Sequence, residues 1–375
     1  MATTLKDVAA LAGVSVATAS RAFQRPELVG ATSRAKVLAA AADLGYSPNR
    51  SARALITGRS GVYGVIVPDL ENPFFPAVLK GAQARAHQLG SQLLITDAGE
   101  APEGELPLVR TLAAQVDGIV LCSSRMTEDS LREAADITPL SLVNRVSPVL
   151  PGVFADPVPG IPSAVRHLHR MGHRRVGYVG GPSVSRSDAV RRTVIERICT
   201  EAGMEWTDIG SFPPTVEGGR SGAEAVLLTD VTAVLVYNDF MALALMERLR
   251  SFGVDVPEEI SVVGWDDIEF SSLVTPGLST VRVPRYDMGV TAIDLLHDGG
   301  QRRNGESHLE CRGSSGVEEL PADADADADA EVSSHGGGHE GGSTAAHGRV
   351  PSHARIGLPT QFIPRGSTAK VTARE

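Results

Sequence analysis

Basic side chains are concentrated at the start of this 375-residue chain, although its formal net charge is −10. Residues 1–59 contain eight Lys and Arg against three Asp and Glu, so this segment is +5 and the remainder is −15. A basic head on an acidic body indicates a polyanionic partner for the head alone. The basic residues are Lys6, Arg21, Arg25, Arg34, Lys36, Arg50, Arg53 and Arg59.

Helical periodicity predicts how the head presents its polar side chains. The run "KDVAALAGVSVATASRAF" has apolar residues at helical spacing before Gly13 and again after Ser15. Gly13 permits a sharp turn, and Ser15 is a good N-cap for a second helix. A third helix is predicted from about Ala31 to Leu44, with Gly45 ending it. Because alanines let these helices approach closely, the polar residues of the second helix face outward.

From residue 61 onward, short runs rich in β-branched residues alternate with helical patterns. The strand-like runs include "VYGVIVPDL", "SQLLITDA" and "VDGIVLCSS", and the alternation begins again at "RRVGYVGGP". Helices are predicted between such runs, for example from Phe75 to Leu89 and from Ser130 to Asp136. This alternation predicts parallel α/β sheets. Two successive sets predict two similar subdomains of about 120 residues each.

Residues 301–353 have a different composition. The stretch "ELPADADADADAEVSSHGGGHEGGSTAAHG" is acidic, rich in Gly and His, and free of aromatic residues. Such a segment cannot bury enough surface to offset its ordering entropy, so we predict that it is disordered. The run "RIGLPTQFIPRGSTA" then returns to a strand-like pattern, which identifies the acidic segment as an insertion.

Several functional classes are disfavoured by what the sequence lacks. It has no G-x-x-x-x-G-K-[ST], G-x-S-x-G or H-E-x-x-H motif, so we expect no enzyme and no cofactor. Three cysteines without C-x-x-C spacing argue against a disulfide scaffold or a zinc site. Neither a membrane helix nor a secretory signal is visible, which favours a cytoplasmic, nucleoid-associated protein and no membrane partner. Metal sensing by the histidines of the insertion, which have no fixed geometry, is a minor alternative: His335, His339, His347 and His353.

The order of motifs resembles the LacI/GalR family of bacterial transcription regulators. "TLKDVAALAGVSVATASRAF" resembles the DNA-binding head of that family and "GYSPNRSARAL" its hinge helix. "GVIVPDLENPFF", "HLHRMGHRRVGYVGGP" and "ISVVGWDDIEFSSLVTPGLSTVR" resemble successive motifs of its body. The resemblance implies an all-α helix-turn-helix head and an α/β, two-lobed, periplasmic-binding-protein-like body with three crossovers. The implied ranges are 1–47 for the head, 48–60 for the hinge and linker, 61–157 with 285–300 for the first lobe, and 158–284 with 354–369 for the second.

The resemblance also assigns roles in the head. The second helix would lie in the major groove, where Arg21 can bond a guanine and Val16 and Ala17 can contact a thymine methyl. Leu55 of the hinge would pair with its copy in a dimer and wedge between base steps in the minor groove. The implied DNA-binding residues are Thr4, Leu5, Ser15, Val16, Ala17, Thr18, Ser20, Arg21, Gln24, Asn49, Ala52 and Leu55.

In the body, the resemblance implies a small ligand held between the lobes. Arg191 offers a planar fork of donors and Asp266 a pair of acceptors, which suit the hydroxyl groups of a sugar or sugar derivative. The implied effector-binding residues are Phe75, Asn144, Arg191, Phe212, Asn238 and Asp266. Each of them could instead be structural, since Asp266 could cap a helix and Phe75 could belong to the core.

The sequence therefore favours a homodimeric, effector-controlled repressor that binds a pseudo-palindromic DNA operator. One alternative is a regulator controlled by a non-sugar effector or by a protein co-regulator. A solute-binding protein of an uptake system is a weaker alternative, because it would not need the basic head. The sequence names neither the operator nor the effector, and it does not say whether the effector releases or strengthens DNA binding.

Overall fold

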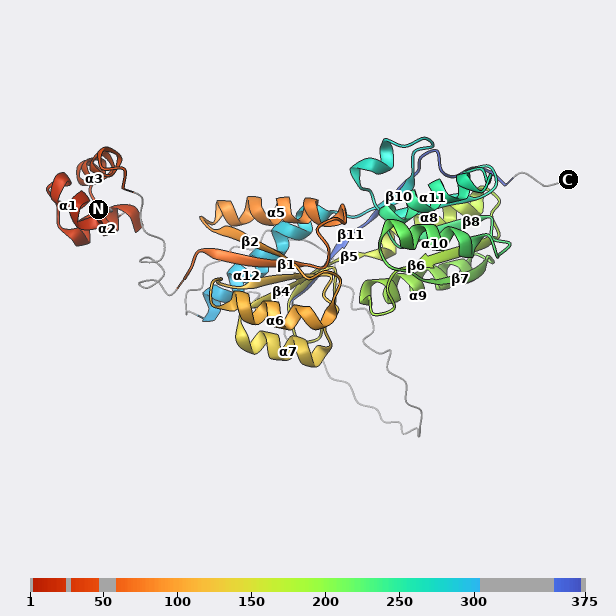
Figure 1. Cartoon of the computed structure of the whole chain (residues 1–375), viewed down its shortest axis with the longest axis horizontal. Coiled ribbons are helices and arrows are strands. Elements are labelled where there is room, and N and C mark those ends of the chain that lie inside the picture. Colours follow the sequence, from red (N-terminus) through yellow and green to blue (C-terminus); the bar gives the residue numbers. More distant parts are fainter. Residues whose placement is uncertain (1–2, 25–27, 47–58, 304–353, 372–375) are drawn as a thin grey trace, which may run out of the picture.

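A helical head and a two-lobed α/β body make up the chain (Figure 1). This computed structural model describes residues 3–24, 28–46, 59–303 and 354–371. The predicted hinge contacts Asn49, Ala52 and Leu55 lie outside the described residues, as does most of the predicted insertion. The predicted fold class, a helix-turn-helix head with a two-sheet α/β body, is confirmed.

The head consists of three short helices around a small core. They are α1 (Leu5–Ala12), α2 (Val16–Gln24) and α3 (Ala31–Asp43). Gly13 ends α1 with a φ of 66°, a left-handed conformation that favours glycine. The buried core consists of alanines and of one valine each from α1 and α3: Val8, Ala9, Ala12, Ala19, Ala22, Val37, Ala40 and Ala41. Half-buried aromatic and aliphatic residues pack against this core: Leu5, Val14, Phe23, Val29, Leu44 and Tyr46.

The first lobe is built on a parallel sheet with the strand order β11-β5-β4-β3-β1-β2. Helices α5 and α12 cover one face, and α6 and α7 cover the other. The strands are β1 (Val62–Val67), β2 (Gln92–Asp97), β3 (Ile119–Cys122), β4 (Leu140–Val143), β5 (Gly152–Asp156) and β11 (Arg355–Pro359). The helices are α5 (Phe74–Gln88), α6 (Pro102–Ala113), α7 (Glu128–Ile137) and α12 (Arg285–Arg303).

The second lobe repeats this arrangement with the order β12-β10-β9-β8-β6-β7, in which only β12 is antiparallel. The strands are β6 (Arg175–Gly180), β7 (Glu205–Ser211), β8 (Ala233–Val236), β9 (Ser261–Asp266), β10 (Ser279–Arg282) and β12 (Gln361–Ile363). The helices are α8 (Pro157–Arg170), α9 (Arg186–Glu201), α10 (Val216–Val226), α11 (Asp239–Ser251) and the 3-10 helix η2 (Glu269–Ser272).

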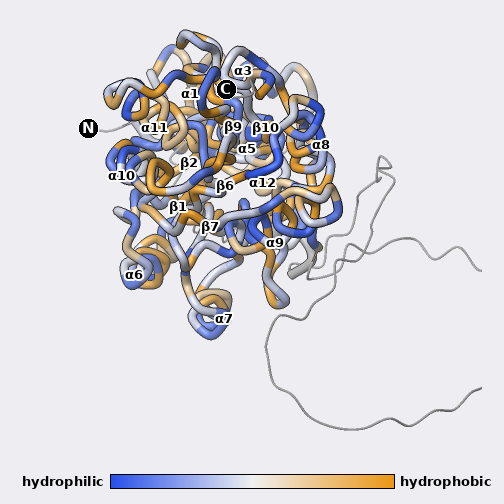
Figure 2. Tube along the Cα trace, turned by 90° about the vertical axis from the view of Figure 1, so that its right-hand side faces the viewer, coloured by the Kyte–Doolittle hydropathy of each residue, from blue (hydrophilic) through white to orange (hydrophobic). Residues whose placement is uncertain are grey.

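One hydrophobic cluster runs through both lobes. It joins side chains of β1, β3 and α5 in the first lobe to side chains of β6, β9 and α8 in the second. The outer faces of the two sheets have separate clusters, under α6 and α7 and under α10 and α11. In Figure 2 the trace of the surrounding helices alternates between hydrophobic and hydrophilic colours, as expected for elements with one buried face.

The chain crosses between the lobes three times, after β5, after β10 and after β11. Thr360 joins the first and third crossings, because its hydroxyl donates to the carbonyl of Asp156 at 2.7 Å and accepts from the amide of Gly160 at 3.1 Å. A Cβ on Gly160 would lie 2.4 Å from Val281, so only glycine fits this crossing. The crossings are therefore packed together and constrain how the lobes can move.

Two predicted boundaries were wrong. The range 354–369 was predicted to belong to the second lobe, but Arg355–Pro359 pairs with β5 in the first sheet, and only Gln361–Ile363 joins the second. The sequence reads as one strand because the change of sheet occurs at a single residue, Thr360. Helix α12 continues through Arg303, three residues into the predicted insertion. The individual helices predicted in the body and head agree within two residues.

Candidate functional site

The second helix of the head presents a narrow stripe to solvent. Val16, Ala17 and Arg21 are exposed, whereas Ala19 and Ala22 are buried in the head core. An arginine fork beside small apolar side chains can bond a guanine edge and contact a thymine methyl group. Of the other residues predicted on this helix, Thr18 and Ser20 are half-buried, and only the backbone of Gln24 is described.

Hydrogen-bonded caps fix the helix ends beside this stripe. The Ser15 hydroxyl accepts from the Thr18 amide at 3.1 Å and lies 2.9 Å from the Thr18 hydroxyl. The Asp7 carboxylate accepts from the Thr4 amide at 2.9 Å and from the Thr4 hydroxyl at 2.7 Å, and these bonds lower the pKa of Asp7. Leu5 is half-buried against the head core. These predicted contact residues therefore also hold the geometry of the head.

A single carboxylate anchors the chain where the body begins. Asp117, in the turn before β3, accepts from the amide and hydroxyl of Ser60 at 2.6 and 2.9 Å and from the amide of Gly61 at 2.9 Å. Three bonds from one carboxylate thus tie the start of the body to the turn before β3.

The second candidate site lies where the carboxyl ends of the two sheets face each other. In open α/β sheets, ligands bind beyond the carboxyl ends of the strands, where the strand order reverses. Here the residues following β1, β3 and β4 meet those following β8 and β9 around a cavity of about 30 Å³, which we call the cleft cavity. It is lined by Asn72, Phe74, Phe75, Ser123, Asn144, Arg191, Tyr237, Asn238, Trp265 and Asp266.

The cleft cavity brings together five of the six residues predicted to bind an effector. Phe212 does not line it, because this residue follows β7, the edge strand, and lies partly buried against the core under α10 and α11. Sequence reasoning missed five lining residues. Three of them stand at strand ends, a position that could have found them: Ser123, Tyr237 and Trp265. Asn72 and Phe74 lie at the end of the loop after β1 and at the start of α5.

The guanidinium of Arg191 is held rigidly in the wall of the cleft cavity. It lies between the rings of Tyr237 and Trp265, at 4.5 and 4.6 Å from their centroids. It also donates to the carbonyl of Tyr237 at 2.6 Å and, more weakly, to that of Ser187 at 3.3 Å. Burial alone would lower its pKa, but Tyr178 and the other groups around it raise it. The side chain is therefore a fixed, charged donor.

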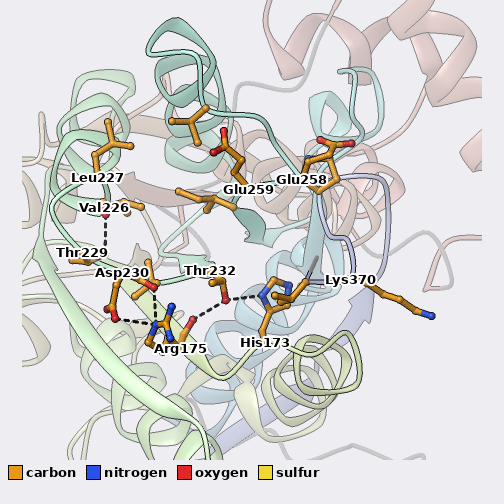
Figure 3. A pocket seen from close by; sticks show the side chains of 15 residues that line it. His173, Arg175, Val226, Leu227, Thr229, Asp230, Thr232, Glu258, Glu259 and Lys370 are labelled. Carbon is orange, nitrogen blue, oxygen red and sulfur yellow. Dashed lines mark hydrogen bonds and ion pairs between the residues drawn. The ribbon is translucent and has the colours of Figure 1, made fainter. Parts of the chain in front are cut away.

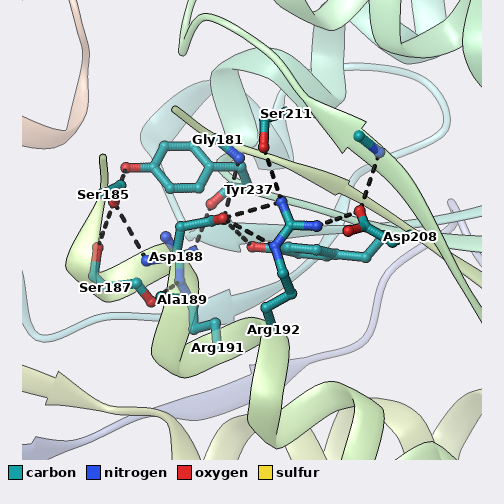
Figure 4. A network of polar contacts seen from close by, with 12 residues as sticks. Gly181, Ser185, Ser187, Asp188, Ala189, Arg191, Arg192, Asp208, Ser211 and Tyr237 are labelled. Atoms are coloured by element: carbon teal, nitrogen blue, oxygen red, sulfur yellow. Dashed lines mark hydrogen bonds and ion pairs between the residues drawn. The ribbon is translucent and has the colours of Figure 1, made fainter. Parts of the chain in front are cut away.

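A polar network fixes the helix that carries this arginine (Figure 4). The buried carboxylate of Asp188 accepts from the Tyr178 hydroxyl at 2.7 Å, the Gly181 amide at 3.1 Å and Arg192 at 3.2 Å. Arg192 also forms an ion pair with Asp208. These contacts tie the first turn of α9 to β6 and β7 and thereby fix the helix backbone that carries the neighbouring Arg191.

Asp266 differs from the other polar residues of the cleft cavity. Among the described residues, no donor bonds its carboxylate, and burial raises its pKa well above the ordinary value, with Asp239 adding to the shift. Asn238, by contrast, uses its side-chain oxygen to accept from the Met241 amide at 2.8 Å. Asp266 therefore keeps free acceptors that can face a ligand.

Backbone strain gathers at the same place. Five non-glycine residues in the described part of the chain have a positive φ, and four of them directly follow or end strands at the cleft: Ser123, Asn144, Asp266 and Asp267. Asp266 is the most extreme, with a φ of 118°. Such conformations cost free energy and cluster at ligand sites. The strain supports the cleft cavity as a binding site.

A larger pocket of about 510 Å³ lies on the second lobe, at the amino ends of β6, β8 and β9 (Figure 3). Its polar side chains bond one another: His173 lies 2.9 Å from the hydroxyl of Thr232, and Arg175 pairs with Asp230 at 3.0 Å. Because these four side chains are engaged with one another and Lys370 points away from the pocket, it offers a ligand less than the smaller cleft cavity does.

Comparison with known proteins finds matches for both the head and the body. Residues 4–49 match the family model described as "Bacterial regulatory proteins, lacI family", and residues 165–312 match "Periplasmic binding protein-like domain". The repressor CytR of Escherichia coli K12 is 32% identical over 331 residues, which cover 84% of this chain and 96% of CytR. The chain belongs to the LacI family. It is therefore a DNA-binding transcriptional regulator controlled by a ligand, and not an enzyme.

Further LacI-family relatives support the same architecture. The regulator GalS of Salmonella typhimurium is 34% identical over 304 residues, covering 79% of this chain and 89% of GalS. The crystal structure of the lac repressor dimer bound to operator and an anti-inducer matches with a TM-score of 0.76 at 24% identity, covering 98% of this chain and all of that chain. A CelR–cellobiose complex matches with a TM-score of 0.64 at 25% identity, covering 97% and 99% of the two chains.

Three other features of the described residues bear on the predictions. No group of three or more His, Cys, Asp or Glu that could hold a metal ion occurs among them. Cys122 and Cys199 are free and buried, and burial raises the pKa of each thiol to about 12. Within the same residues, no helix has both the length and the apolar composition needed to cross a bilayer.

Asp239 makes the stability of this LacI-family body depend on pH. Its buried carboxylate accepts from Ser271, Thr280 and the Ile268 amide, and burial raises its pKa to about 6. An aspartate in the unfolded chain has a pKa of about 3.9. The folded body therefore holds an extra proton on Asp239 between about pH 4 and pH 6. The stabilisation is complete below about pH 4 and is lost as the pH rises through about 6.

We therefore expect the stability of wild type, relative to Asp239→Asn, to fall by about 2–4 kcal/mol between pH 4 and pH 7. The asparagine cannot ionise, so groups that do not interact with Asp239 cancel in the comparison, and the difference includes the coupled change at Asp266. Urea unfolding of both proteins across this range measures the difference. Parallel profiles would show that Asp239 keeps an ordinary pKa.

Proposed function

We propose that the protein is a cytoplasmic, homodimeric repressor that binds a pseudo-palindromic operator and responds to a small polyhydroxylated effector, a sugar or sugar derivative, in the cleft cavity. The observation that carries the DNA-binding part is the exposure of Val16, Ala17 and Arg21 on one stripe of α2 above a buried alanine seam. A two-fold protein with such a head requires a two-fold binding site. The matched lac repressor dimer is bound to operator DNA and the matched CelR to cellobiose, which supports the assignment.

The effector part rests on the chemistry of the cleft cavity. Arg191 presents a fixed donor fork, Asp266 presents free acceptors, and Asn144 and Asn238 add amides. Aromatic side chains of both lobes, including Phe75 and Trp265, provide faces for a ring. In this arrangement the cavity holds about one water, so a sugar enters only if the lobes separate or side chains move. Effector binding would therefore act on lobe position.

Control of DNA then follows from the anchoring of the linker. A ligand affects DNA affinity only if it binds two body conformations with different affinity. A change in the first lobe would reach the linker through Asp117, which holds Ser60 and Gly61. An effector that is not a sugar would act on DNA binding through the same contacts of Asp117. The alternative of a non-sugar effector therefore differs only in which ligand the cleft cavity binds.

Arg21→Ala should weaken binding to the operator by about 1–3 kcal/mol and relax the preference for one base pair in each half-site. The operator is first obtained by selecting fragments from a random DNA pool with the wild-type protein. Titration of selected and random DNA then separates the two contributions. Arg34→Ala, which removes an exposed charge from α3, is the matched control and should retain the preference.

An equal loss on selected and random DNA would instead make Arg21 a phosphate contact. If the wild type selected no sequence at all, sequence-specific repression itself would be rejected.

A further inference from the structure

Arg285 connects the two lobes beside the cleft cavity. This first residue of α12 donates from Nη1 to the carbonyl of Pro73 at 3.0 Å and from Nη2 to the carbonyl of Asp267 at 2.9 Å. Pro73 precedes α5 in the first lobe, and Asp267 follows β9 in the second. One guanidinium thus bonds a main-chain carbonyl from each lobe.

Both carbonyls belong to the rims of the cleft cavity. Pro73 lies between Asn72 and Phe74, which line it, and Asp267 directly follows Asp266, which also lines it. Arg285 itself is not among the lining residues. Its contacts therefore depend on the relative position of the two rims without requiring contact with a ligand.

The second-lobe rim is rigid at this point. The carboxylate of Asp267 accepts from Arg282 at 2.6 Å and from Arg365 at 2.5 Å. Its φ of 56° is held against the usual preference of a non-glycine residue. Asp267 is fixed within the second lobe, whereas Pro73 belongs to the first. A rotation of one lobe relative to the other must therefore change the distance of Asp267 from Arg285 or from Pro73.

Arg285 has little else to bond if it loses these two carbonyls. It is only 8% exposed, and its ion pair with Glu269 is long, at 3.7 Å, to a carboxylate that is 74% exposed. A buried guanidinium that loses a hydrogen-bond partner is strongly disfavoured. The lobe arrangement that keeps both carbonyls within reach is stabilised accordingly.

We propose that Arg285 is a positioning residue that braces the crossing between β10 and α12 and stabilises the lobe arrangement in which the cleft cavity is assembled. This inference rests on the proposed effector control of the body. Arg285 would link the two lobes within the protein itself. It would influence how strongly the body responds to the effector without contacting the effector.

The first test needs no effector. Nitroxide labels are attached to cysteines at Asp129 and Val190, exposed positions in the first turns of α7 and α9, which begin at the cleft in opposite lobes. Cys311→Ser removes a competing thiol. Pulsed dipolar spectroscopy of the full chain then gives the distance distribution between the lobes. Arg285→Met should broaden the distribution and shift it to longer distances.

Two matched variants keep this test decisive. Arg285→Lys retains the charge and stem but lacks the fork needed to hold two carbonyls, so it should also broaden the distribution. Arg248→Met removes a guanidinium that bonds Glu224 within the second lobe and does not contact Asp267, and it should match wild type. If Arg285→Met does not fold, Arg285→Lys decides alone. Wild-type distributions for the folded Arg285 variants would overturn the proposal.

A second measurement separates positioning from contact. Ligand affinity falls in proportion to the fraction of molecules in the binding-competent state. Binding of ribose, galactose and cytidine to wild type and to Arg285→Met is titrated. For each of these ligands that binds wild type, Arg285→Met should weaken the affinity by the same factor. That factor should be roughly tenfold, the effect of losing one charged hydrogen bond. A different factor for each ligand would identify Arg285 as a contact residue. If none binds, the effector assignment fails, whereas the label distances still test the brace.

Discussion

Asp266→Asn is expected to abolish the response to effector while leaving operator affinity without effector within about twofold of wild type. A buried ligand hydroxyl that loses its partner costs about 1–3 kcal/mol, so replacing the carboxyl group should weaken effector binding by roughly 5- to 150-fold. Asparagine has nearly the shape of aspartate and shares its greater tolerance of a positive φ, whereas alanine would add strain. The substitution therefore tests the acceptor and not the backbone.

The measurement is a DNA titration with and without each member of a panel of sugars and nucleosides. Phe212→Leu is the matched control, since Phe212 lies outside the cleft cavity, and it should respond as wild type does. A normal response from Asp266→Asn would mean that the effector binds elsewhere. The larger pocket near His173 would then be the next site to test.

Arg145→Ala should destabilise the body by about 3–5 kcal/mol. Arg145 is 2% exposed and donates to the carbonyls of Ser124 and Met126 at 2.8 and 2.6 Å and to Glu128 at 2.8 Å. Removing it leaves two carbonyls and a carboxylate without their donor. Burial raises the pKa of Glu128, but bonds from Ser147 and Arg145 lower it overall, so the carboxylate would also become easier to protonate.

Urea unfolding followed by circular dichroism measures this loss as a shift in midpoint at constant slope. The double variant Arg145→Met with Glu128→Gln should recover part of it, because replacing both partners leaves no unpaired charge. A loss below about 1 kcal/mol for Arg145→Ala would show that water replaces the guanidinium at little cost.

The parts of the fold that depend on local patterns were predictable. Glycine at position 13, serine at position 15 and the alanine spacing are sufficient to place three head helices, because caps and helical periodicity act within a few residues. The alternation of strands and helices likewise predicts two parallel sheets. The change of sheet at Thr360 was not predictable, because nothing local distinguishes a strand that changes partners from one that continues.

The cleft cavity was predicted in part for a similar reason. Polar residues such as Asn144 and Asp266 stand at strand ends, which a parallel sheet gathers at one edge. Phe212 also follows a strand, but its strand lies at the edge of the sheet, and only the strand order reveals this. The contacts of Arg285 join residues that are about 200 positions apart in the chain, and no local pattern indicates them.

The pairing of β11 and β12 also determines when the body can fold during translation. β11 completes the first sheet against β5, about 200 residues earlier, and β12 completes the second sheet against β10. A ribosome that has reached the end of α12 therefore carries a nascent chain with a complete head and a body in which β5 and β10, interior strands of the finished sheets, still form the sheet edges. Open edges invite pairing with other chains. We therefore expect a product that ends after α12 to aggregate more readily than the full chain, because two strands that are normally interior would be open to pairing.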